Sequence, residues 1–200
     1  MKEYREIMES IYTYYPKNCS FEDKKYKATE EHMRYETILK DTKWREKISN
    51  KIYKIIQSIF ISNYITKWTN NEYPSIHYSV LLHKNQSILD DDEELLAILN
   101  GKRLDLELYV SLLDSYYYLY VIETLKASNK NEWKFNYYNA DEFVGEEEMN
   151  LLTEKLLIEG FSKIDRNIVH KIVPYIETEL HYAGEVKIFH CLFSDVENMF

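Results

Sequence analysis

The sequence predicts a mainly α fold, a single helical domain of about six to seven helices with a small two-stranded β element near residues 132–138 and 185–193. Two observations indicate this. Apolar residues recur at steps of three and four along several segments, and all four glycines stand where such helices would begin or end. The 200 residues carry no Gly/Ser/Pro-rich linker, so we expect one domain over 1–200. An N-terminal helical subregion (1–70) and an acidic C-terminal subregion (71–200) are its candidate subdivisions.

Three helices are expected in the N-terminal subregion. The first covers residues 2–15 and is stopped by Pro16, and the second runs over residues 24–40. The third, from residue 42 to about 68, has the clearest amphipathic pattern, with an apolar stripe at helical spacing: Trp44, Ile48, Ile52, Ile55 and Ile59. Lysines beside this stripe are interpreted as a solvated face rather than a membrane or nucleic-acid surface.

The middle of the chain allows two interpretations at two places. Residues 75–84 (SIHYSVLLHK) suit a short strand or another helix. After a helix at about 91–100, residues 103–126 are predicted as a helix that is apolar over most of its circumference, which indicates burial or an oligomer interface. The competing interpretation ends that helix near Asp114 and makes residues 116–124 (YYYLYVIET) a strand.

The C-terminal part is expected to hold both strands of the small β element. Trp133, Phe135 and Tyr137 alternate with polar residues, which is typical of a strand. Residues 185–193 (EVKIFHCLF) are predicted as the second strand, paired with the first. Between them we expect helices over residues 146–159 and 165–183, the second kinked or divided by Pro174.

Charge is distributed unevenly. The net charge is −9, yet residues 1–70 hold 14 Lys/Arg against 10 Asp/Glu (+4), and residues 71–200 hold 11 against 24 (−13). Two clusters carry the highest acidic density, and both lie near expected helix starts, where carboxylates also act as caps. The clusters are Asp90, Asp91, Asp92, Glu93 and Glu94, and then Asp141, Glu142, Glu146, Glu147 and Glu148.

Several kinds of chemistry are disfavoured by missing motifs. Neither phosphate-binding glycine loop is present, nor are the G-x-S-x-G and H-E-x-x-H patterns, and no cofactor is expected. A metal-dependent hydrolase using His170, Glu177 and His181 is the alternative, although Pro174 interrupts the register that would align them. His77 and His83 are weaker acid–base candidates.

The compartment is predicted from what the chain lacks. No apolar run approaches the roughly 20 residues of a membrane span, and the first residues do not resemble a signal peptide. Cys19 and Cys191 stand far apart without a C-x-x-C partner, so two reduced thiols are expected. These features predict a cytoplasmic protein without a membrane partner, and the net acidity disfavours nucleic acid.

The leading hypothesis is a non-enzymatic, bacterial protein-binding module. It would be an acidic inhibitor of the immunity or antitoxin type, docking on a basic partner such as a nuclease toxin. The two acidic clusters would contact positively charged side chains of the partner. Tyr117, Tyr118 and Trp133 would serve as anchor residues, because aromatic side chains bury a large surface area and have few rotatable bonds. A homodimer or other homo-oligomeric structural or regulatory protein, joined through residues 103–126, is the remaining alternative.

Overall fold

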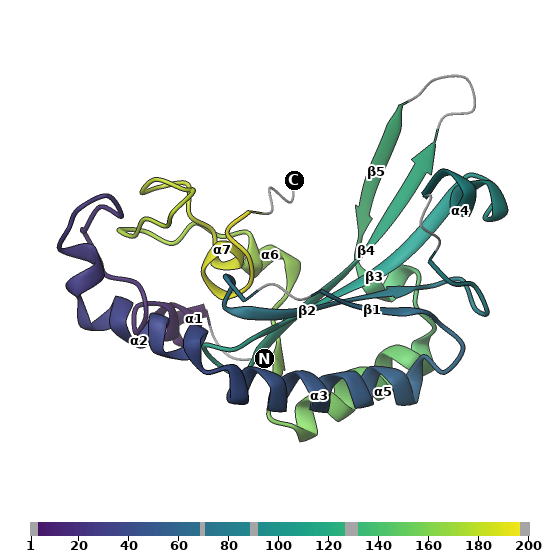
Figure 1. Ribbon diagram of the computed structural model, residues 1–200, viewed down its shortest axis with the longest axis horizontal. Coiled ribbons are helices and arrows are strands. Elements are labelled where there is room, and N and C mark those ends of the chain that lie inside the picture. Colours follow the sequence, from purple (N-terminus) through teal and green to yellow (C-terminus); the bar gives the residue numbers. More distant parts are fainter. Residues whose placement is uncertain (1–3, 69–70, 89–91, 127–131, 197–200) are drawn as a thin grey trace.

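The chain folds around a twisted antiparallel sheet that helices cover on both faces (Figure 1). The computed structural model describes residues 4–68, 71–88, 92–126 and 132–196. Five strands lie in sequence order across the sheet, and a short sixth pairs in parallel with the start of β4. They are β1 (Ile65–Trp68), β2 (Ser75–Leu81), β3 (Lys102–Ser111), β4 (Tyr116–Lys126), β5 (Trp133–Tyr138) and β6 (Ser162–Lys163).

The helices precede, interrupt and follow this meander. Three of them come before β1, and α4 lies between β2 and β3. The α-helices are α1 (Tyr4–Ile11), α2 (Glu30–Lys40), α3 (Thr42–Ile59), α4 (Asp92–Ile98), α5 (Glu146–Ile158), α6 (Arg166–Val169) and α7 (Ile188–Leu192). Two short 3₁₀ turns are η1 (Tyr26–Ala28) and η2 (Ala140–Glu142).

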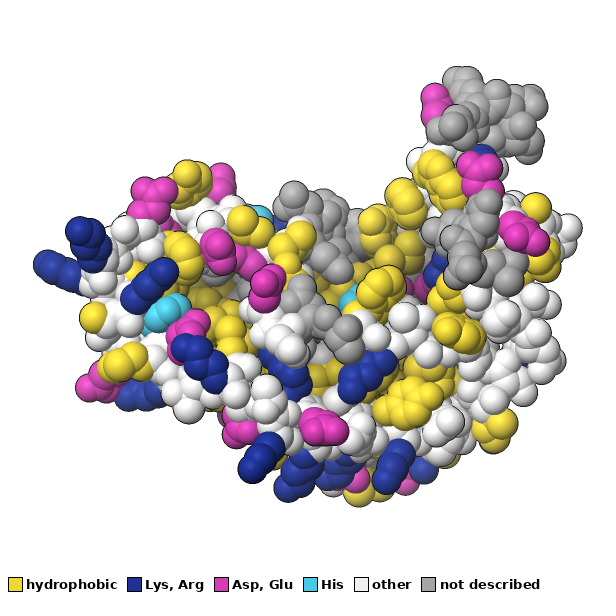
Figure 2. All heavy atoms as spheres, viewed as in Figure 1, with side chains coloured by type: hydrophobic (Ala, Val, Ile, Leu, Met, Phe, Trp, Pro, Cys, Tyr) yellow, Lys and Arg dark blue, Asp and Glu magenta, His cyan; other side chains and the backbone are white. Residues whose placement is uncertain are grey.

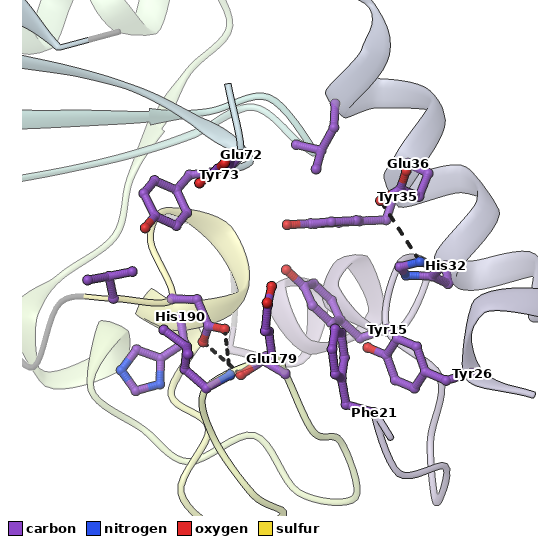
Figure 3. A pocket seen from close by; sticks show the side chains of 15 residues that line it. Tyr15, Phe21, Tyr26, His32, Tyr35, Glu36, Glu72, Tyr73, Glu179 and His190 are labelled. Atoms are coloured by element: carbon purple, nitrogen blue, oxygen red, sulfur yellow. Dashed lines mark hydrogen bonds and ion pairs between the residues drawn. The ribbon is translucent and has the colours of Figure 1, made fainter. Parts of the chain in front are cut away.

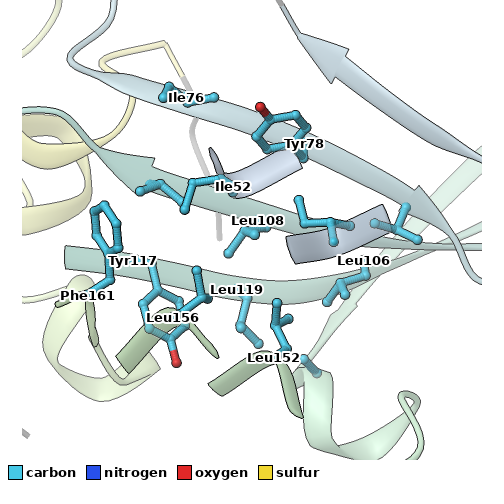
Figure 4. Packing of buried hydrophobic residues seen from close by; sticks show 14 of the residues in the cluster. Ile52, Ile76, Tyr78, Leu106, Leu108, Tyr117, Leu119, Leu152, Leu156 and Phe161 are labelled. Atoms are coloured by element: carbon cyan, nitrogen blue, oxygen red, sulfur yellow. The ribbon is translucent and has the colours of Figure 1, made fainter. Parts of the chain in front are cut away.

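One face of the sheet packs on α3 and α5 (Figure 4). Alternate strand residues such as Leu106, Leu108 and Leu119 point to this side, because side chains alternate along a strand. They meet Ile52 of α3 and Leu152 of α5, both 0% exposed. We call this cluster the α3/α5 core. It consists of aliphatic side chains with a few aromatic rings, held between regular elements.

The opposite face packs on elements from both ends of the chain. Tyr109 and Tyr118, which face each other across β3 and β4, contact Phe189 and Phe193 at 5.3–6.4 Å between ring centroids. Ile7 and Ile11 of α1 and the buried free thiol of Cys191 belong to the same cluster, the C-terminal core. Helix α1 is thereby packed against the C-terminal segment.

The mainly α prediction is wrong, because residues 103–126 form the two central strands β3 and β4 instead of one helix. Leu104 and Leu108 are four residues apart, and side chains with this spacing lie on the same side of both a helix and a strand. The tyrosine run of β4 is buried on both faces, which removes the alternation that marks a half-exposed strand. The competing interpretation of residues 116–124 as a strand is the correct one.

The second expected strand is also wrong. Within residues 185–193 the chain forms α7, whose five residues are all buried, and a continuous apolar run cannot distinguish strand from helix by period. The strand at residues 132–138 is confirmed as β5, but it pairs with β4.

The expected helix over residues 165–183 is limited to the single turn of α6. Residues after it turn back, and the Val173 amide donates to the Val186 carbonyl (2.8 Å) immediately before Pro174. In the N-terminal part of the chain, the helix expected up to residue 68 ends at Ile59, and residues 65–68 form β1. The segment left open at residues 75–84 contains strand β2.

Several helix predictions are confirmed with shortened ends. Asp41 caps α3 by accepting from the Trp44 amide (2.9 Å), and Thr29 caps α2 by accepting from the His32 amide (3.2 Å). Helix α5 ends before Gly160, whose φ of +90° suits a residue without Cβ. Within the described ranges, no helix has the length and apolar character that crossing a membrane requires.

Candidate binding cavity

A cavity of about 500 Å³ lies between α2 and the C-terminal segment (Figure 3). Its walls come from four stretches that are far apart in sequence: the segment from Tyr15 to Tyr26, helix α2, the two residues before Pro74, and the region around residues 178–196. The lining residues are Tyr15, Phe21, Tyr26, His32, Tyr35, Glu36, Leu39, Glu72, Tyr73, Thr178, Glu179, Leu180, His190, Asp195 and Val196.

Tyrosine rings form one side of the cavity. Tyr15 and Tyr35 lie 5.3 Å apart between ring centroids, and Tyr26 packs on Phe21 at 5.0 Å. The Tyr15 hydroxyl donates to the Cys191 carbonyl (2.8 Å) and the Tyr26 hydroxyl to the Glu177 carbonyl (3.2 Å), which connects the segment after α1 and the turn η1 to the C-terminal segment. Burial raises the pKa of all three tyrosines, so their hydroxyls are uncharged at neutral pH.

Among the described residues that line the cavity there are four carboxylates and neither lysine nor arginine. Glu36 forms an ion pair with Lys40 outside the lining (2.6 Å). Asp195 is oriented by the Thr178 hydroxyl (2.7 Å) and the Leu180 amide (3.1 Å), both of which donate to its carboxylate. Glu179 is exposed, and its carboxylate points into the cavity (Figure 3). The lining is therefore strongly anionic.

His32 adds no positive charge at neutral pH. Its ring lies between Tyr26 and Tyr35, at 5.1 and 6.1 Å between centroids, and burial lowers its pKa below the usual 6.5. The nearby Glu36 carboxylate, 3.9 Å from Nε2, raises this pKa but has less effect than burial. A ligand in the cavity consequently meets carboxylates, neutral rings and a neutral imidazole.

One group in the described part of the chain has the composition of a metal site. Potential ligand atoms of His181, His190 and Asp195 lie within 4.8 Å of one another. However, the two imidazole rings are stacked at 3.8 Å and 5°, so their in-plane lone pairs do not converge on one ion. The Lys187 amide also donates to His190 Nδ1 (3.2 Å), which leaves the proton of the neutral ring on Nε2. This arrangement suits hydrogen bonding better than metal coordination.

A buried polar cluster on the sheet surrounds Glu107. His77 Nε2 and the Ser79 hydroxyl each lie 2.5 Å from Glu107 Oε2, and Trp68 Nε1 donates to the Ser79 hydroxyl (2.7 Å). Tyr109 stacks on the His77 ring at 4.0 Å. The carboxylate, rather than the imidazole, contacts the serine, so the geometry differs from a nucleophile–base pair.

The first acidic cluster is only partly described. Asp90 and Asp91 lie outside the described residues, and Asp92 begins α4. Glu93 pairs with Lys126 (2.6 Å), and Glu94 is exposed. At least one carboxylate of this cluster therefore forms an ion pair with a lysine of the same chain.

In the second cluster, capping and ion pairs account for three of the five acids. Glu142 accepts from the Asn139 amide (3.1 Å), Asp141 lies 3.6 Å from Lys163, and Glu148 lies 3.5 Å from Lys84. Glu146 and Glu147 are exposed in the first turn of α5.

The three expected anchor residues differ in exposure. Tyr117 lies in the α3/α5 core and Tyr118 in the C-terminal core, 1% and 2% exposed, so both pack inside the folded protein. Trp133 is 37% exposed at the start of β5.

The histidines and glutamate of the metal alternative fall in different surroundings. His170 packs on the Tyr118 ring, Glu177 accepts from Ser20 and the Phe21 amide, and His181 lies beside Asp195. Of the two acid–base candidates, His77 bonds Glu107 and His83 accepts from the Leu104 amide (3.1 Å).

The residues that form the cavity were missed from the sequence. Tyr35 and Glu36 are neighbours in α2, and Glu72 and Glu179 lie in two other distant segments, so no spacing or motif connects the three segments. The one signal was the excess of tyrosine, 19 in 200 residues, several of which gather here.

Comparisons with family models, curated proteins and solved structures gave no match.

Proposed function

We propose that this protein is a non-enzymatic, cytoplasmic binding module that docks on a basic protein partner, in the manner of an immunity or antitoxin protein that inhibits a nuclease toxin. The observation that carries the proposal is the cavity between α2 and the C-terminal segment. Four carboxylates line it without a lysine or arginine among the lining residues. Anionic pockets of this kind attract cationic groups and repel anionic ones.

The rest of the molecule supports a partner of positive charge. The net charge of −9 gives long-range attraction toward a basic protein and raises the rate of encounter. Aromatic residues at the cavity provide contact area for a bound side chain, with Tyr35 and Tyr73 partly exposed there. Charge would therefore bring the partner close, and the cavity would hold it.

A space-filling view is consistent with this division of roles. Figure 2 shows a hollow beside the N-terminal helices that hydrophobic side chains line, with both acidic and basic side chains around it. Lysine and arginine side chains gather along the opposite, lower edge of the same view, beneath α3. A basic partner is expected to approach from the side of the hollow.

The test is capture of the partner from the native host, followed by calorimetry with purified components. Glu179→Gln removes an exposed carboxylate from the cavity and is expected to weaken binding about tenfold, the loss of roughly 1.4 kcal/mol. It should also reduce the dependence of affinity on salt. Glu154→Gln, an exposed glutamate on α5, is the matched control with the same change in net charge.

The same assay also distinguishes the contribution of the cavity to partner binding from that of the acidic clusters. Joint replacement of Asp91, Asp92 and Glu94 by amides tests the first cluster in the same assay. If Glu179→Gln and Glu154→Gln leave the same affinity and salt dependence, the cavity does not hold the partner. A captured partner that is acidic would also overturn the proposal.

A further inference from the structure

The carboxylates of the cavity reach it from several directions. Glu36 belongs to α2, Glu72 precedes β2, and Glu179 and Asp195 belong to the C-terminal segment. In Figure 3, Glu72 and Glu36 lie on one side of the cavity, and Glu179 extends toward them from the other. Glu36 already pairs with Lys40, and Asp195 accepts from Thr178 and Leu180, so a ligand would add N–H donors, in more than one direction, to carboxylates that are in part already bonded.

Guanidinium and ammonium groups differ in this respect. The guanidinium of arginine is planar and carries five N–H donors in a fixed fork, so one group can bond two carboxylates at once. The ammonium of lysine is a compact, strongly hydrated point charge. Separate carboxylates therefore favour arginine.

The aromatic lining favours the same group. Figure 3 shows the Tyr35 ring extending into the cavity from α2, with Tyr73 across from it. A flat guanidinium stacks on such ring faces and gains both cation–π attraction and contact area. The tyrosine hydroxyl oxygens also offer hydrogen-bond acceptors to the guanidinium.

The size of the cavity indicates more than an isolated ion. A volume of about 500 Å³ lies within the range of pockets that hold a small organic ligand. The cavity has room for an arginine side chain together with part of the peptide that carries it. We infer that the group which enters the cavity is an arginine side chain on a loop of the partner, an inference that rests on the proposed function.

The test uses small probes on the full-length protein. N-acetyl-arginine methylamide, the lysine analogue and the neutral isostere N-acetyl-citrulline methylamide are titrated at low salt and followed by NMR and calorimetry. The arginine probe is expected to saturate at millimolar concentration, the lysine probe to bind at least about fivefold more weakly, and the citrulline probe not to bind. Equal binding of arginine and citrulline, or equal binding of arginine and lysine, would overturn the inference.

Variants locate the probe in the cavity. Glu179→Gln should weaken the arginine probe by about fivefold, whereas Glu154→Gln should leave it unchanged. Tyr35→Phe keeps the ring and should retain most of the binding, while Tyr35→Leu should lose it. An arginine titration that Glu179→Gln and Tyr35→Leu do not alter would place binding elsewhere and contradict the inference.

The two proposals fail in different ways. If a basic partner depends on Glu179 but no arginine probe binds, and arginine-to-lysine changes in the partner have no effect, the inference about arginine is wrong and the proposed function stands. If the arginine probe binds in the cavity but no protein partner depends on Glu179, the proposed function is wrong and the arginine site stands.

Discussion

The α3/α5 core and the cavity are built from different kinds of contact. In the α3/α5 core, Ile52, Leu152 and Leu156 are at most 1% exposed and meet strand residues of regular period. In the cavity, tyrosines, carboxylates and an imidazole from distant segments are held by individual hydrogen bonds, such as that of Tyr15 to Cys191. We therefore expect substitutions in the α3/α5 core to lower stability more than substitutions of exposed cavity residues.

The largest effect is expected in the α3/α5 core. Leu152→Ala should lower the free energy of unfolding by about 3 kcal/mol, because it removes buried methyl groups and leaves a cavity. Urea denaturation followed by circular dichroism measures this. Leu157→Ala on the same helix is the control, since Leu157 is 64% exposed and should lose less than about 0.5 kcal/mol. Equal losses for the two variants would contradict the packing of α5 on the sheet.

An intermediate effect is expected at the polar cluster on the other face of the sheet. Glu107→Leu should cost about 2 kcal/mol, because the Ser79 hydroxyl and the His77 ring lose a buried charged acceptor. Glu107→Gln retains an acceptor oxygen and should lose less. A double-mutant cycle with His77→Gln measures the coupling of the pair. No coupling would show that the contact between Glu107 and His77 does not stabilise this face of the sheet.

The smallest effect is a dependence of stability on mildly acidic pH. Burial lowers the pKa values of His32, His83 and His170 below the usual 6.5, with Arg103 and Lys102 adding to the effect at His83. The unfolded chain then binds more protons than the folded one, so stability is complete above about pH 6.5 and falls as the pH drops below it. We expect the melting temperature to decrease by a few degrees between pH 7.5 and 5.5.

His83 allows this pH dependence to be assigned. Its Nε2 accepts from the Leu104 amide, and protonation removes that acceptor. His83→Gln supplies an amide oxygen that does not titrate, so its melting temperature should fall less over the same pH range than that of the wild type. A variant with an unchanged pH profile would show that His32 and His170 carry the whole effect.

The outcome of the predictions follows the physics of each segment. The helices expected over residues 42–68 and 146–159 are present over Thr42–Ile59 and Glu146–Ile158, because one face of each is buried and the other exposed, which leaves a period of 3.6 in the sequence. The leading interpretation missed strand β3 and gave β4 only as the alternative, because both strands are covered on both faces and their leucines are spaced in multiples that a helix shares. Likewise the five residues of α7 (Ile188–Leu192) are all buried, so the apolar run has no period that separates helix from strand.

By itself, the sequence determined the amphipathic helices, their caps and the crowding of acidic charge into residues 71–200, because these depend on neighbours within one turn of chain or on composition alone. Only the tertiary structure decided that the middle of the chain is a sheet and that Tyr35, Glu36, Glu72 and Glu179 meet around one cavity. Those features depend on contacts between residues far apart along the chain, and such contacts leave no spacing in the sequence from which they could be predicted.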